Sequence, residues 1–161
     1  VLISDEFTHP HKRRRMVEKR ARKFVGVAAD VPAPALEGPS DAQVTLLGWG
    51  STYGVIREAI EMLAEKGVVA NQLAIKWLVP FHSDIVAGIL SESNRVLIVE
   101  NSYSGQFARY LRSETGFSAQ GHIRKYDGEP FMPHHVVEGV LELLVGDSDS
   151  DLYVPYQEII V

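Results

Sequence analysis

The sequence predicts an α/β fold with a doubly wound, mostly parallel sheet. Apolar, β-prone segments near residues 43–48, 69–76, 95–100 and 119–124 are each followed by a segment with the apolar spacing of an amphipathic helix. The segment at 95–100 is the strongest strand, because its near-continuous apolar run is typical of a strand covered on both faces. Since crossovers between parallel strands are right-handed, the helices should cover both faces of the sheet.

The composition is that of a globular domain without cysteine chemistry. With 161 residues and 45% hydrophobic content, the chain has the size and the apolar content for one packed core. The absence of cysteine excludes a disulfide, a thiolate nucleophile and a cysteine-ligated zinc or iron–sulfur cluster in this chain. No apolar run approaches the roughly 18 residues of a membrane span, and no signal-peptide core is present. We therefore expect a cytoplasmic location and no membrane partner.

The N-terminal region is strongly basic and differs from the rest of the chain. Half of the 16 basic residues lie between Lys12 and Lys23, in a helix expected at residues 11–25. This helix could bind a polyanion, or it could lie on an acidic neighbour. We favour the acidic neighbour because no aromatic residues interleave the cations to stack on bases. The chain starts at Val1 without a start-like context, so we expect a fragment of a longer polypeptide.

The expected organisation has three parts. Residues 1–40 form the basic helix and a proline-rich linker, because Pro32, Pro34 and Pro39 lie within residues 26–39. Residues 41–146 form the α/β sandwich domain. Residues 147–161 form an acidic tail, whose last ten residues either add an edge strand or dock elsewhere.

The central stretch of the chain, residues 44–67, reads as a strand, a glycine-rich turn and a helix. Ser51 or Thr52 can cap the helix, and such a turn can receive an anion. The dinucleotide fingerprint does not fit, however, because the glycines are spaced G-x-G-x-x-x-G and Tyr53 occupies the place of the third one. We favour the alternative that these glycines let strand and helix pack closely.

A second polar turn, residues 100–106, follows the strongest strand. Because parallel strands end at the same edge of a sheet, the two turns should lie side by side as a docking or ligand surface. Glu100 could act as a base or bind a ribose, or it could serve as a helix-terminus partner. The aromatic rings in these turns could either dock a partner or fold back onto the core. The candidate residues are Gly48, Trp49, Gly50, Ser51, Thr52, Glu100, Asn101, Tyr103, Ser104, Gly105 and Gln106.

No catalytic, cofactor-binding or metal-ligating residue can be named from the sequence. None of the six histidines has a partner at a recognised zinc-protease spacing, and the chain contains neither a G-x-S-x-G elbow nor a P-loop. A helix should begin at Ser83, and another at Pro133. We expect Leu46, Ile60, Val96 and Ile98 in the core.

Four segments, taken together, resemble the α subunits of 2-oxoacid:ferredoxin oxidoreductases, in particular the 2-oxoglutarate type. They are residues 14–22 (RRMVEKRAR), 47–56 (LGWGSTYGVI), 99–106 (VENSYSGQ) and 123–131 (IRKYDGEPF), the last followed by Pro133. The resemblance implies a three-layer α/β/α sandwich similar to the C-terminal domain of transketolase. Its sheet would have about five strands, of which one could be antiparallel to the rest.

The resemblance also implies a part of an enzyme. The whole enzyme would oxidatively decarboxylate a 2-oxoacid to an acyl-CoA, using thiamine diphosphate, Mg²⁺ and an iron–sulfur cluster. This chain holds none of these cofactors, so by itself it should be inactive and serve subunit contacts. The implied partners are the N-terminal part of the same α subunit, the β subunit, ferredoxin and coenzyme A. Two alternatives remain open: an independent nucleotide- or coenzyme A-binding module, and a nucleic-acid binder acting through the basic helix.

Overall fold

The computed structural model of the chain describes residues 9–146 and 150–155. It divides into two compact units, one formed by Val1–Ala33 with Trp77–His82 and the other by Pro34–Lys76 with Ser83–Val161. The basic helix and the α/β sheet therefore belong to different units.

The first unit contains the basic helix α1 (Pro10–Asp30), which has no buried residues. It begins with a proline in its first turn and ends where the Val31 N–H donates to the Val27 carbonyl. The Val31 carbonyl in turn lies 3.0 Å from Nε2 of His82. The helix is longer than predicted, because a single glycine, Gly26, costs only about 1 kcal/mol and the alanines after it favour helix. The expectation of a linker beginning at residue 26 is therefore wrong.

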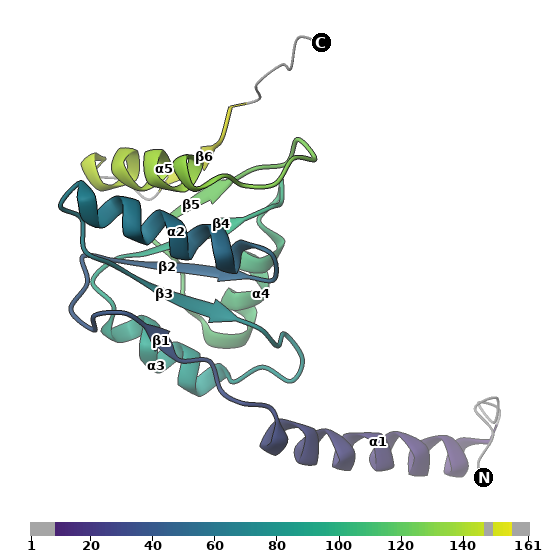
Figure 1. Ribbon diagram of the computed structural model, residues 1–161. Helices are drawn as coiled ribbons and strands as arrows, with labels where there is room; N and C mark the ends of the chain where they lie inside the picture. The colour runs from purple at the N-terminus through teal and green to yellow at the C-terminus, as the bar shows by residue number, and fades with distance from the viewer. Residues whose placement is uncertain (1–8, 147–149, 156–161) are drawn as a thin grey trace. The chain divides into compact units, whose positions relative to one another are not determined.

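In the second unit, the described residues form a six-stranded sheet with the order β1-β3-β2-β4-β5-β6 (Figure 1). The strands are β1 (Leu36–Glu37), β2 (Val44–Trp49), β3 (Ala70–Ile75), β4 (Val96–Glu100), β5 (Gly121–Arg124) and β6 (Ser150–Tyr153). Neighbouring strands run parallel except for β1, which is antiparallel to β3. The predicted fold class is confirmed.

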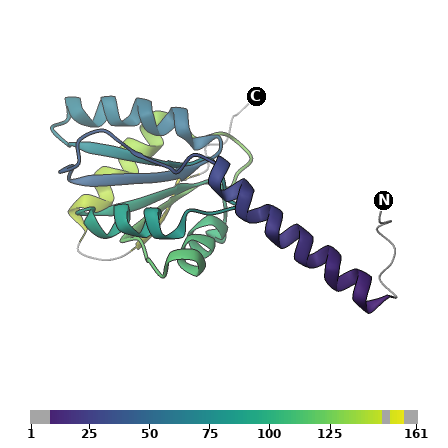
Figure 2. The same ribbon diagram turned by 90° about the horizontal axis from the view of Figure 1, so that it is seen from below.

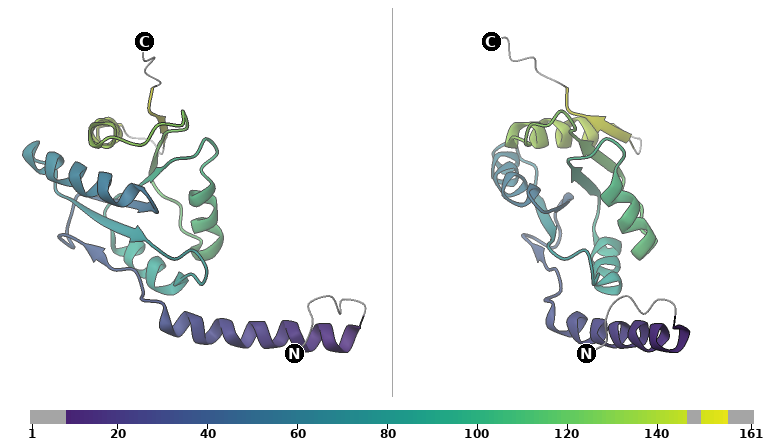
Figure 3. Two further views of the ribbon diagram at one scale, coloured as in Figure 1. Left: turned by 45° about the vertical axis from the view of Figure 1, so that its right-hand side comes forward. Right: turned by 90° about the vertical axis from the view of Figure 1, so that its right-hand side faces the viewer.

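Helices cover both faces of this sheet. The helices are α2 (Thr52–Glu65), α3 (Ser83–Glu92), α4 (Gln106–Thr115) and α5 (Pro133–Val145). Figure 2 shows α2 on one face and α3 and α4 on the other, and Figure 3 shows α5 beside α2. The result is the three-layer arrangement that right-handed crossovers produce. None of the helices in the described part of the chain is long and apolar enough to cross a bilayer.

The core lies where the strands are covered on both faces. Leu46, Val96 and Ile98 are buried as predicted, with at most 1% of their surface exposed. Ile60, in contrast, is only partly buried at the rim of the core cluster under α2 and α5, so its predicted burial is wrong. The physical reason is its position on the helix: the inward line of α2 is Ile56, Ala59 and Leu63, and Ile60 lies beside it.

Both ends of the sheet differ from the sequence-based expectation. Strand β1 lies in the segment expected to be a linker, where its two residues pair with Leu73 and Gln72 of β3. Strand β6 adds an edge strand parallel to β5 and begins at Ser150, two residues before the segment in which an edge strand was expected. The rest of the predicted acidic tail, residues 147–149 and 156–161, lies outside the described residues.

Candidate functional site

The sheet has a topological switch point between β2 and β4. From β2 the chain moves outward to β3, and it then crosses back over β2 to form β4 on the other side. In open α/β sheets, the crevice outside the carboxyl ends of the strands at such a point is the usual place for a ligand. The two candidate turns, after β2 and after β4, lie at this crevice.

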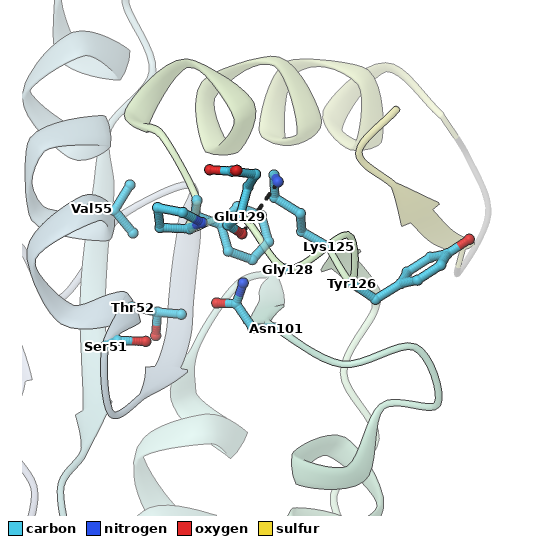
Figure 4. Close-up of a pocket in the computed structure, with 10 residues that line it drawn as sticks. Ser51, Thr52, Val55, Asn101, Lys125, Tyr126, Gly128 and Glu129 are labelled. Atoms are coloured by element: carbon cyan, nitrogen blue, oxygen red, sulfur yellow. Dashed lines mark hydrogen bonds between the residues drawn. The ribbon is translucent and has the colours of Figure 1, made fainter. Parts of the chain in front are cut away.

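Residues from both turns share one small cavity of about 230 Å³, lined by Trp49, Gly50, Ser51, Thr52 and Asn101. A larger neighbouring pocket of about 510 Å³ lies between the start of α2 and the loop after β5 (Figure 4). Its lining residues are Ser51, Thr52, Val55, Asn101, Lys125, Tyr126, Gly128, Glu129, Pro130 and Phe131. The candidate turns are therefore side by side.

The first glycine of the β2–α2 turn serves close packing. A Cβ on Gly48 would lie 2.4 Å from Oγ1 of Thr52 and 2.5 Å from Cδ1 of Ile56, so only glycine lets the strand end approach the helix. Gly50 has φ +60°, which suits glycine in this tight turn. The prediction that Ser51 or Thr52 caps α2 is wrong, because no side chain caps this N-terminus. Oγ1 of Thr52 donates instead to the Trp49 carbonyl at 3.0 Å.

Glu100 closes the β4–α4 turn. Its side chain is 1% exposed, and its carboxylate accepts hydrogen bonds from the backbone N–H of Phe107 at 2.7 Å and of Ala108 at 3.3 Å. The hydroxyl of Ser102 accepts two more, from Gly105 and Gln106. The carboxylate thus neutralises the first turn of α4 and its positive dipole end. Of the roles left open for Glu100, the structure supports that of a helix-terminus partner.

A buried lysine lies in the larger pocket, and we did not single it out from the sequence. Lys125 follows β5 directly and is 3% exposed. Its ammonium donates to the carboxylate of Asp127. It also donates to the carbonyl of Glu129 at 3.3 Å, as Figure 4 shows. The hydrogen bond from Lys125 holds the pKa of Asp127 below its usual value. A cation directly after a strand predicted to end at this edge was the signal that could have identified it.

The two aromatic residues of the turns behave differently. Trp49 is 40% exposed and stacks on the buried ring of Phe107, with ring centroids 6.0 Å apart. Tyr103 is 66% exposed and contacts Tyr126 and Tyr153 at centroid distances of 5.0 and 6.1 Å. We call these three tyrosines the tyrosine cluster. Trp49 therefore rests partly on the core, whereas Tyr103 belongs to an exposed aromatic surface.

The described residues do not fit a metal ion, and the sequence does not fit an iron–sulfur cluster. The sequence contains no cysteine that could ligate an iron–sulfur cluster. Within residues 9–146 and 150–155, no three His, Asp or Glu side chains are grouped so that they could hold a metal ion. The described residues at this crevice offer hydrogen bonding, one paired ammonium, the carboxylate of Glu129 and aromatic contact.

Comparison with known proteins identifies the family. Residues 42–136 match the pyruvate:ferredoxin oxidoreductase core domain II. The chain belongs to this family. The matched segment runs from just before β2 into α5 and so contains both candidate turns.

Relatives agree with this family assignment and with the predicted resemblance, which is confirmed. The α subunit of 2-oxoacid:ferredoxin oxidoreductase 1 from Aeropyrum pernix is 36% identical over 156 residues, which cover 91% of this chain and 24% of that subunit. The 2-oxoglutarate:ferredoxin oxidoreductase from Magnetococcus marinus, solved with 2-oxoglutarate, coenzyme A and succinyl-CoA bound, matches with a TM-score of 0.72 and 28% identity. That match covers 84% of this chain and 24% of the other. This core domain II chain thus spans about a quarter of the length of these relatives.

The fold also matches a split-gene transketolase, described as an inactive β4 tetramer, with a TM-score of 0.52 and 17% identity over 68% of this chain and 41% of that one. An identity this low shows the fold alone. It confirms the expected transketolase-like architecture of the core domain II chain.

Proposed function

We propose that this chain is the core domain II part of the α subunit of a 2-oxoacid:ferredoxin oxidoreductase of the 2-oxoglutarate type. The single observation that carries the proposal is the family match over residues 42–136. The structural match to the Magnetococcus marinus enzyme, at a TM-score of 0.72, supports 2-oxoglutarate as the substrate class. The whole enzyme would oxidatively decarboxylate a 2-oxoacid to an acyl-CoA.

Within that enzyme we assign this chain a structural and subunit-contact role. Thiamine diphosphate, Mg²⁺ and the iron–sulfur cluster would be held by other parts of the enzyme, since the sequence has no cysteine and the described residues hold no group of metal ligands. The partners in this proposal are the N-terminal part of the same α subunit, the β subunit, ferredoxin and coenzyme A. The cytoplasm stays the predicted location.

We expect no thiamine diphosphate binding and no 2-oxoacid:acceptor activity from the isolated chain. The test is a calorimetric titration of the 161-residue chain with thiamine diphosphate and Mg²⁺, together with an acceptor-reduction assay with 2-oxoglutarate and coenzyme A. A tight binding isotherm would remove the domain assignment.

The crevice between β2 and β4 is, in this proposal, the docking surface for the remaining part of the same α subunit. The length of the relatives supports this occupant, because about three quarters of such a subunit lies outside this chain. The exposure of Trp49 and Tyr103 supports it as well, since large aromatic residues are enriched where partners bury surface. The two turns are then held in place by Gly48, Glu100 and Gly105. Polar groups at the docking surface come from Ser51, Asn101 and Ser104.

Removing both rings should weaken this docking. Combined Trp49→Ala and Tyr103→Ala should reduce the affinity for the remaining part of the α subunit by about tenfold or more, because buried aromatic anchors dominate interface energies. The stability of the isolated chain should change little. Binding is measured by calorimetry and stability by urea unfolding.

The matched control changes exposed apolar side chains at the opposite edge of the sheet, in the pair Val69→Ala, just before β3, and Val145→Ala, at the end of α5. This pair should leave docking unchanged. If the aromatic double variant instead unfolds the chain and leaves association intact in the folded fraction, the rings are core residues and the docking surface lies elsewhere.

A further inference from the structure

A third pocket, which is polar, lies between α4 and strands β5 and β6, on the sheet face that carries α3 and α4. It has a volume of about 360 Å³. Its lining residues are Ile98, Ser104, Gly105, Ala108, Arg109, Arg112, Phe117, Ser118, Ala119, His122, Arg124 and Asp151. We propose that this pocket binds a small oxyanion of the phosphate class, as free phosphate or as the phosphate group of a larger ligand. This proposal does not depend on the oxidoreductase assignment.

The charge of the pocket favours an anion. Among the described residues that line it, three arginines face a single carboxylate, that of Asp151, so the formal charge is 3 − 1 = +2 with His122 neutral. Guanidinium groups bind phosphate in a bidentate manner with short, charge-assisted hydrogen bonds. The hydroxyls of Ser104 and Ser118 add neutral donors to the same wall.

The buried member of the set is Arg124, and its position is fixed. The residue is 8% exposed, and its Nη1 donates to the carboxylate of Asp151 at 3.0 Å and to the hydroxyl of Tyr153 at 3.2 Å. Its guanidinium also lies over the ring of Tyr153. A guanidinium held in one orientation loses little freedom when a ligand binds.

One hydrogen-bond donor of the Arg124 guanidinium has no acceptor among the described residues. Its Nε–H is buried and has no hydrogen-bond partner within the residues that the structure describes. A buried, unpaired donor on a charged group is unfavourable, and an oxyanion in the pocket would supply acceptors to this side chain. Arg124 therefore forms the fixed end of the proposed site.

Arg109 and Arg112 form its adjustable end. They lie three residues apart on α4, which puts both side chains on one face of the helix. Both are exposed, and neither guanidinium makes an ion pair or a hydrogen bond within residues 9–146 and 150–155. The backbone donors at the N-terminus of α4 are not part of the site, because Glu100 already occupies them.

Gly105 leaves the space that the Arg124 guanidinium occupies. A Cβ at this position would lie 2.6 Å from Nη2 and 2.8 Å from Cζ of Arg124, so a side chain here would displace the guanidinium. Gly105 also has φ +65°, which L residues rarely adopt. Gly105→Ala therefore disturbs the site without changing its charge.

The test is a titration of the 161-residue chain with inorganic phosphate at constant ionic strength, followed by amide chemical shifts of residues 104–112 and 118–124. We expect saturable shifts with a Kd below about 10 mM. Arg109→Gln and Arg112→Gln should each weaken binding about tenfold, the usual effect of losing a charge-assisted hydrogen bond. Acetate at the same ionic strength should bind more weakly, because it carries one charge and two acceptor atoms.

The matched control is Arg57→Gln, which changes another exposed arginine, on α2 at the opposite face of the sheet. It should leave the phosphate Kd unchanged. Absence of saturation, or equal weakening by Arg57→Gln, would overturn the proposal, because the interaction would then be general charge attraction. If an arginine variant is found unfolded by circular dichroism, Gly105→Ala provides the second test. Unchanged phosphate affinity in folded Gly105→Ala would also overturn the proposal.

Discussion

Replacing Ile98 with alanine should lower the free energy of unfolding of this chain by about 2 to 5 kcal/mol. Ile98 is 1% exposed in β4, which has β2 on one side and β5 on the other. It pairs with Leu47 of β2 and with His122 of β5, so the strand cannot move toward the space that the shorter side chain leaves. The cost therefore combines lost burial with a residual cavity.

Urea unfolding followed by circular dichroism measures this change, with an unchanged m value showing that the same structure unfolds. Ile85→Ala is the control, since Ile85 lies exposed on α3 and its truncation should cost under about 0.5 kcal/mol. If Ile98→Ala costs as little as the control, β4 is not a central strand.

Replacing Glu100 with glutamine should destabilise the chain by about 1 to 3 kcal/mol, the range for losing hydrogen bonds to a buried charged group. The amide keeps the shape of the carboxylate but removes its charge from the positive end of α4. It also places an NH₂ donor against one of the two backbone donors, Phe107 N–H or Ala108 N–H, which the carboxylate now satisfies.

The change should be concentrated in α4. Amide hydrogen exchange should therefore be faster at Phe107 and Ala108 in this variant, while the amides of α5 keep their protection. Glu58→Gln, an exposed position on α2, is the control and should change stability by less than about 0.5 kcal/mol. An unaltered exchange rate at Phe107 would mean that the carboxylate does not hold the first turn of α4.

Most of the fold could be predicted because its signals are local. The apolar runs of β2 and β4 and the three-to-four spacing of α2 and α5 are visible in short windows of sequence, and both ends of α2 carry turn residues. Strand β1 had no such signal. Its two residues become a strand only because the edge of β3 offers free backbone groups to an extended proline-rich segment.

The candidate site was predictable in its position and less so in its contents. Placing Trp49 and Asn101 at one crevice required only that two parallel strands end at the same edge. Lys125 and Tyr126 reach the site from the loop after β5, and Tyr153 joins the tyrosine cluster from β6. Their participation depends on the strand order, which the helix and strand periodicities do not encode.

The sequence by itself determined the fold class, the central strands, the two turns at the carboxyl edge and the family resemblance, because each of these depends on residues close together in the chain. Only the tertiary structure decided that Glu100 satisfies α4, that α2 has no side-chain cap, and that Arg109, Arg112 and Arg124 surround one pocket. The physical reason is that hydrogen-bond satisfaction and charge clustering are settled between elements. Such contacts join residues that only the packed sheet brings within a few ångströms of one another.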